Sequence, residues 1–155
     1  MRNLLLTLLA AATLANAQLA TKKALTLDLA KKIADATNAE AVANKWTMVI
    51  AIVDDGGNLM YLQRADGTQI GSIEVAQEKA RSAVKFKRPT KAFEDAVVGG
   101  RQAILKLPGA MPVEGGVPLM IDGVMLGAIG VSGATSAQDG QCAAAGLKAF
   151  EKFGK

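Results

Sequence analysis

The sequence predicts a single α+β domain in which helices pack against an antiparallel sheet. Two pairs of apolar segments, 46–53 with 59–64 and 117–121 with 124–131, are each joined by a short polar turn. Such connections are typical of hairpins, whose strands run antiparallel. The segments around the hairpins have the apolar period of helices. At 155 residues the chain is long enough for one domain and short for two.

Residues 1–17 have the parts of a secretory signal peptide. Arg2 gives a positive start, residues 4–14 are apolar, and the sequence Ala-Asn-Ala supplies the small side chains of a cleavage site before Gln18. The apolar segment is too short to span a bilayer as a helix. We therefore expect an exported protein, periplasmic or secreted, whose mature chain is one domain of residues 18–155 with no membrane span.

The first half of this domain is expected to run helix, hairpin, helix. Thr26 can cap a first helix that ends near Asn44. The segment 46–53 is continuously apolar, which favours a strand buried on both faces. Ser72 can cap the second helix, which must stop before Pro89 because proline disfavours helical geometry in the residue ahead of it.

The second half is expected to run helix, hairpin, helix. Thr90 can cap a third helix, which the glycines at 99–100 interrupt, and residues 101–107 can add a further turn or two. Asp122 and Gly123 then indicate a two-residue hairpin turn of type I′ between the last two strands.

The stretch 114–140 combines this hairpin with a glycine-rich loop that leads into the last helix. Ser136 and Asp139 resemble a capping box, and the helix is expected to reach about Phe153. Glycines recur there every three residues, which in a strand indicates close approach by another backbone or by a ligand. These glycines are Gly127, Gly130 and Gly133.

The composition excludes several classes of function. The chain has no histidine, which removes Ser-His-Asp and Cys-His catalysis and most zinc sites. The net charge is only +4, the basic residues are spread out and aromatic residues are few, so we expect no nucleic-acid partner. Cys142 is the single cysteine and lies on the apolar stripe of the last helix, which favours burial of its thiol. Dinucleotide and P-loop motifs are absent.

Two candidate sites can be derived from the residues of the stretch 114–140. The amides of residues 133–136, with the hydroxyls of Ser132, Thr135 and Ser136, could receive a carboxylate at the positive end of the last helix. The same groups could instead serve only to cap that helix. Glu114, beside flexible glycines, could bind a ligand or a metal or act as a base, or it could be a solvated turn residue.

The densest basic region follows the second helix. It consists of Arg81, Lys85, Lys87, Arg88 and Lys91. These residues could clamp a carboxylate or a phosphate, although a charged surface is the other interpretation. Glu74 and Glu78 lie one helical turn apart, so their charges repel unless a cation such as Arg81 or a metal ion lies between them. A solvated helix face is the other interpretation of this pair.

Four segments that cover nearly the whole mature chain carry a resemblance to a known family. They are LTLDLAKKIADATNAEA, VIAIVDDGGNLMYLQRADG, KARSAVKFKRPTKAFE and LPGAMPVEGGVPLMIDGVMLGAIGVSGATSAQDGQCAAAG. Together they resemble the GlcG/HbpS-like family, a haem-binding or haem-degrading domain that also forms the C-terminal part of PduO-type corrinoid adenosyltransferases. The last segment is the most specific, because Glu114, Pro118 and Asp139 fall where the family pattern places them.

The resemblance implies a profilin-like sandwich, with an antiparallel sheet of about five strands flanked by helices. It also implies homo-oligomers built from dimers, octameric in some members, and an exported haem-binding protein that sequesters or degrades haem. Some relatives use histidine as the axial iron ligand and others use oxygen ligands such as threonine. Here the ligand stays open among Tyr61, Cys142, a threonine, a methionine and a lysine.

These observations lead to one leading hypothesis and two alternatives. The leading hypothesis is an exported haem- or tetrapyrrole-binding protein. The alternatives are a binding module for a small organic acid and an enzyme that degrades haem, for which no catalytic residue or resident metal ligand can be assigned. The candidate ligand-binding residues are Arg81, Lys85, Arg88, Thr90, Glu114, Ser132 and Thr135.

The predicted signal peptide can be tested by the mass of the exported protein. When the whole chain is produced in a secreting bacterium, the purified protein should begin at Gln18, because cleavage follows the small residues before it. Intact-mass measurement decides this. A mature protein that retains residues 1–17 would contradict the assignment of a cleaved signal.

Overall fold

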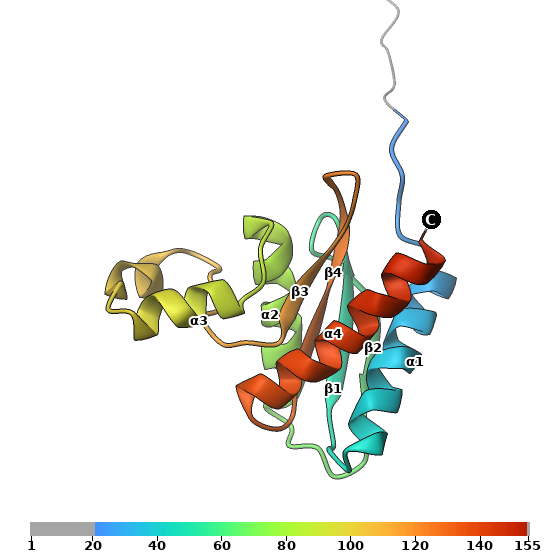
Figure 1. Cartoon of the computed structure of the whole chain (residues 1–155), viewed down its shortest axis with the longest axis horizontal. Coiled ribbons are helices and arrows are strands. Elements are labelled where there is room, and N and C mark those ends of the chain that lie inside the picture. The colour runs from blue at the N-terminus through green and yellow to red at the C-terminus, as the bar shows by residue number, and fades with distance from the viewer. Residues whose placement is uncertain (1–20, 155) are drawn as a thin grey trace, which may run out of the picture.

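The computed structural model describes residues 21–154, so the predicted signal peptide and its cleavage site lie outside the described residues. The order of elements expected from the sequence is confirmed (Figure 1). The elements are α1 (Leu27–Ala43), β1 (Val49–Asp54), β2 (Leu59–Arg64), α2 (Ser72–Phe86), α3 (Lys91–Val98), the 3₁₀ helix η1 (Gln102–Lys106), β3 (Gly116–Ile121), β4 (Val124–Ser132) and α4 (Ser136–Phe153). No helix in this described part is long and apolar enough to cross a membrane.

The strands form one antiparallel sheet in the order β2-β1-β4-β3. The described residues thus give four strands where the family resemblance implied about five. Helices α1 and α4 pack together on one face of the sheet, and α2 covers the other face (Figure 1). The domain is therefore a three-layer α+β sandwich with a core on each side of the sheet.

Strand β1 supplies side chains to both cores, as its continuous apolar sequence predicts. Ile50 and Ile52 face the large core under α1 and α4, whereas Ala51 and Val53 face α2. All are buried. Because successive side chains of a strand point to opposite faces, a strand covered on both sides must be apolar throughout.

The glycines of β3 and β4 let the sheet touch the backbone of α2. A Cβ added at Gly130 would overlap the carbonyl oxygen of Ala76, and one added at Gly116 would overlap that of Lys79. The other two regularly spaced glycines, Gly127 and Gly133, lie against the carbonyls of Val53 and Thr47. All three therefore indicate close approach by another backbone, one of the two interpretations that the sequence left open.

The sequence predicted the turn between β3 and β4 correctly, but it placed the starts of β1 and α2 incorrectly. Asp122 and Gly123 both have positive φ, 52° and 76°, as a type I′ turn requires. Strand β1 begins three residues later than expected, because the Trp46 amide is bonded to the Ala41 carbonyl at the end of α1. Gly71 occupies the N-cap position of α2 that was expected for Ser72.

Helix α3 and η1 form an arm, residues 91–107, that projects from the body of the domain (Figure 1). The two elements pack on each other, and Phe93 and Ile104 are buried. The glycines at 99–100 end α3, as the sequence predicted, and allow the chain to turn back into η1.

Replacing Gly130 should test the close approach of β4 and α2. Gly130→Ala should lower the free energy of unfolding by about 3 kcal/mol, because the new methyl group overlaps rigid helix backbone. Gly71→Ala is the control, since Gly71 has helical φ and open space around it, and its effect should stay within about 1 kcal/mol. Urea denaturation measures both variants, and equal stabilities would contradict the packing described.

Candidate functional site

A buried ion pair lies beneath the loop that precedes α4. The ammonium of Lys79 on α2 is 2.7 Å from an Asp139 carboxylate oxygen and donates to the Val131 carbonyl at 3.0 Å. The two side chains are only 1% and 4% exposed. Two charges this deeply buried are tolerated only when they neutralise each other and their remaining hydrogen bonds are satisfied.

The second oxygen of Asp139 fills the predicted anion site from within the chain. It accepts a hydrogen bond from the Ala134 amide at 3.2 Å. Burial raises the pKa of the Asp139 carboxyl, while Lys79 and the amides of Ala134 and Gly133 oppose that rise. A ligand carboxylate at residues 133–136 would therefore have to displace an internal carboxylate.

The start of α4 also differs from the predicted capping box. Thr135, not Ser136, is the N-cap, and its hydroxyl accepts from the Gln138 amide while the Gln138 side chain accepts from the Thr135 amide. The predicted partner Asp139 turns inward to Lys79 instead. A one-residue shift in the cap therefore moves Asp139 from the helix surface to the core.

Ser132 lies inside the protein and apart from Thr135. Its hydroxyl is 3.2 Å from the Ser72 hydroxyl, to which the Gln69 side chain donates. Ser132 is buried, whereas Thr135 is exposed. These two candidate residues do not form one site, and Ser132 contributes to the packing of β4 on the start of α2.

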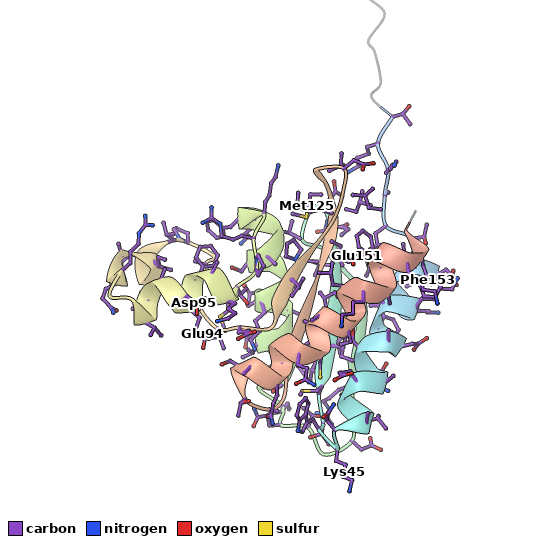
Figure 2. The ribbon with its side chains drawn as sticks, in the orientation of Figure 1. Lys45, Glu94, Asp95, Met125, Glu151 and Phe153 are labelled. Carbon is purple, nitrogen blue, oxygen red and sulfur yellow. The ribbon has the colours of Figure 1, made fainter. Side chains whose placement is uncertain are left out.

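Glu114 lies between the arm and α4. Its carboxylate packs against Gly140 in the first turns of α4, and its amide donates to Glu94 on α3. The Ser136 hydroxyl lies 3.1 Å from the other oxygen of Glu94, and Figure 2 shows Glu94 close to the start of α4. Burial raises the pKa of Glu114, Lys91 opposes this rise, and the neighbouring carboxylates of α3 add to it.

Thr90 has a structural position in the same region. Its hydroxyl accepts from the Gly116 amide at 2.9 Å, and its amide donates to the Gly116 carbonyl at 3.0 Å. Although Thr90 precedes α3 as predicted, its side chain does not cap that helix. It fixes the root of the arm to the first residue of β3.

Arg81 already has partners within the chain. Its guanidinium pairs with Glu78 at 2.6 Å and bonds to Gln77 at 3.2 Å, so it neutralises one of the two acids on this helix face as predicted. Arg81 is therefore less available to a ligand than the basic residues that follow it.

No group of three or more acidic or cysteine side chains that could hold a metal ion occurs within residues 21–154.

Lys85, Lys87 and Arg88 form a cationic corner at the end of α2. All three are exposed, and among the described residues none of them forms an ion pair. The Arg88 guanidinium lies 5.5 Å from the ring centre of Phe93, which packs edge-on against Phe86. The cationic corner thus presents positive charge next to the half-buried ring of Phe86, an arrangement that suits a planar anion.

The backbone of Lys87 sets the shape of this corner. Lys87 adopts the left-handed conformation, with φ 51° and ψ 40°, and its amide bonds to the carbonyls of Ala83 and Val84. This geometry ends α2 and turns the chain toward Pro89. Sequence reasoning placed Lys87 in this basic region but missed Lys79. Lys79 could have been found, because it stands beside alanines on the buried face of α2.

A cavity of about 470 Å³ lies elsewhere, between β3, the end of α4 and the segment before α1. Its lining includes the charged side chains of Lys23, Asp122 and Glu151. The volume falls in the range of small-molecule sites, but two carboxylates against one amine disfavour an anion. None of the predicted site residues lines this cavity.

The structure therefore brings only part of the predicted site together. Lys85 and Arg88 meet in the cationic corner, and Thr90 follows it along the chain. Glu114 lies at the root of the arm. The remaining candidates, Arg81, Ser132 and Thr135, have partners or positions elsewhere in the domain.

Comparisons with known proteins give a consistent result. The family described as HbpS-like haem-degrading proteins matches residues 25–148. Protein GlcG of Escherichia coli K12 is 42% identical over 112 residues, which are 72% of this chain and 84% of GlcG.

Solved structures show the same fold. A double mutant of HbpS from Streptomyces reticuli is 31% identical with a TM-score of 0.76, over 84% of this chain and 89% of that one. A complex of PduOC with haem is 27% identical with a TM-score of 0.74, over 82% of this chain and 95% of that one.

Asp139→Asn should test the buried ion pair. The change leaves the Lys79 ammonium buried without a counter-charge, so the free energy of unfolding should fall by about 3–5 kcal/mol. Asp28→Asn removes the exposed pair with Lys32 and should cost less than about 1 kcal/mol. Chemical denaturation at neutral pH measures both variants. Similar losses of unfolding free energy would contradict a larger contribution of the buried pair to stability.

Proposed function

Because the chain belongs to the HbpS-like family of haem-degrading proteins, we propose that it binds haem or a related tetrapyrrole. The family match over residues 25–148 is the observation that carries this proposal. A relative with the same fold is a complex with haem, which supports it. We further propose that the protein is exported, as residues 1–17 predict, and that it forms homo-oligomers built from dimers.

The cationic corner is the region whose chemistry suits the ligand best. Haem has a flat aromatic ring and two propionate groups, which ionise at neutral pH like other carboxylates. Lys85 and Arg88 can bind these carboxylates, and the half-buried ring of Phe86 lies beside them, supported from beneath by the buried Phe93. The 470 Å³ cavity carries the opposite charge balance.

The chain offers poorer axial ligands for the haem iron than it offers cations for the propionates. The chain has no histidine, and burial raises the pKa of the Cys142 thiol to about 11, so a thiolate is disfavoured. Tyr61 lies on β2, at the other edge of the sheet from β3. Met111, whose amide donates to Ser82 of α2, is a thioether in the neighbourhood of the corner. We therefore expect lower affinity than a histidine-ligated site would give.

Bound haem would supply the redox and oxygen chemistry of its own iron. The residues of this chain would bind the propionates, orient the ring and limit its contact with water. In sequestration the bound haem would stay intact, whereas in degradation its ring would be opened and its iron released. Loss of Soret absorbance with release of iron, faster than for free haem, would support degradation, and equal rates would support sequestration.

Titration with haemin tests the binding proposal. The mature protein should give a saturable Soret shift at micromolar haemin, and Lys85→Ala/Arg88→Ala should raise the Kd about tenfold by removing two charge-assisted contacts. Lys31→Ala/Lys148→Ala is the matched control. It removes the same charge from exposed positions on α1 and α4, across the sheet, and should bind as the parent does.

Two results would overturn parts of this proposal. No saturable shift with the parent protein would remove haem as the ligand. A normal shift in the Lys85/Arg88 variant would remove the cationic corner as the site. If hydroxy acids raise the Tm of the parent but not of that variant, the corner serves a small organic acid, which is the alternative function.

A further inference from the structure

We infer that the arm, residues 91–107, is a two-fold contact surface on which a second copy of this chain packs through its own arm. The inference rests on the homo-oligomer that is part of the proposed function and names the surface that builds it. Three observations on the arm carry it: exposed apolar side chains, a fixed root and a charge distribution that complements itself.

The outer surface of the arm is unusually apolar. Val98, Leu105 and Leu107 are 83%, 55% and 43% exposed. They are three of the nine large apolar side chains exposed within residues 21–154, and they fall within ten consecutive positions. The other six are spread over α1, both hairpins, the loop before α2 and the end of α4. Scattered apolar residues are normal on a surface, whereas a concentration indicates an interface.

The root of the arm is held in one orientation. Thr90 is bonded to Gly116 in both directions, and Glu94 accepts from the Glu114 amide and lies 3.1 Å from the Ser136 hydroxyl. These contacts leave Asp95 and Val98 of α3 exposed. A projecting element with a fixed root can offer an apolar surface to a partner with little loss of conformational entropy on binding.

The charges of the arm identify the partner as a second copy. Asp95 is exposed at the middle of α3, close to Glu94 in Figure 2, whereas Arg101 is exposed just beyond the end of α3. Two arms aligned antiparallel about a two-fold axis near Val98, which lies midway between Asp95 and Arg101 along the chain, bring Arg101 of each to Asp95 of the other. A two-fold interface requires such self-complementarity.

The Lys91–Asp95 pair does not oppose this arrangement. Its atoms are 2.7 Å apart, but both side chains are more than half exposed. An exposed pair one helical turn apart contributes less than about 0.5 kcal/mol. Arg101 of a second copy can therefore replace Lys91 as the partner of Asp95 at small cost.

Light scattering across a concentration series tests the surface. The mature parent should have at least the mass of a dimer at micromolar concentration, and Val98→Asp/Leu105→Asp should have the mass of one chain. Val42→Asp/Ile70→Asp is the matched control, because those side chains are 65% and 78% exposed but lie outside the arm, and it should keep the parent mass. Both variants should keep the parent circular dichroism spectrum, since they change exposed side chains only. The Tm of Val98→Asp/Leu105→Asp should fall, because a dimer stabilises the folded state by mass action.

A charge exchange tests the antiparallel alignment. Asp95→Arg and Arg101→Asp should each raise the dimer Kd about tenfold or more through like-charge contacts, and the double exchange should restore it. Loss of the dimer without recovery in the double variant would overturn the alignment. A parent-like mass for Val98→Asp/Leu105→Asp would overturn the surface. A parent of single-chain mass would overturn the oligomer, while the haemin titration would still decide the ligand.

Discussion

The contact between α2 and the sheet is the constraint on which the rest of this domain depends. Because Gly130 and Gly116 have no side chains, the backbone of the helix lies directly on β4 and β3. That distance places Lys79 under the loop before α4, where it reaches Asp139. The ion pair in turn fixes the start of α4, against which Glu114 packs. A wider separation would leave two buried charges without partners.

The fold could be predicted because its signals are local. The continuous apolar run of β1 and the Asp122-Gly123 turn each depend on a few adjacent residues, and both matched the structure. Positions decided by distant partners could not be predicted in the same way. Asp139 read as a helix cap because its true partner, Lys79, is 60 positions away along the chain. Local capping and long-range pairing compete for the same side chain, and pairing prevailed.

The candidate site divides in the same manner. Lys85 and Arg88 adjoin one helix end, so their proximity could be read from the sequence, and the structure leaves both without an acidic partner among residues 21–154. Ser132 and Thr135 are close in sequence, but Ser132 is buried in the protein and Thr135 is exposed to solvent. A loop rich in glycine and hydroxyl groups indicates an anion site. It does not reveal that the chain provides the anion itself, through Asp139.

Lys87 shows what the cationic corner costs the fold. Lys87 has a positive φ. At such a position a residue with a side chain makes the folded state less stable than glycine would, by about 1 kcal/mol, and glycine ends many helices for that reason. The chain nevertheless has a lysine at this position. Stability and charge are therefore in opposition at one residue, and a variant improved for thermal resistance at Lys87 would lose part of the field that attracts an anion.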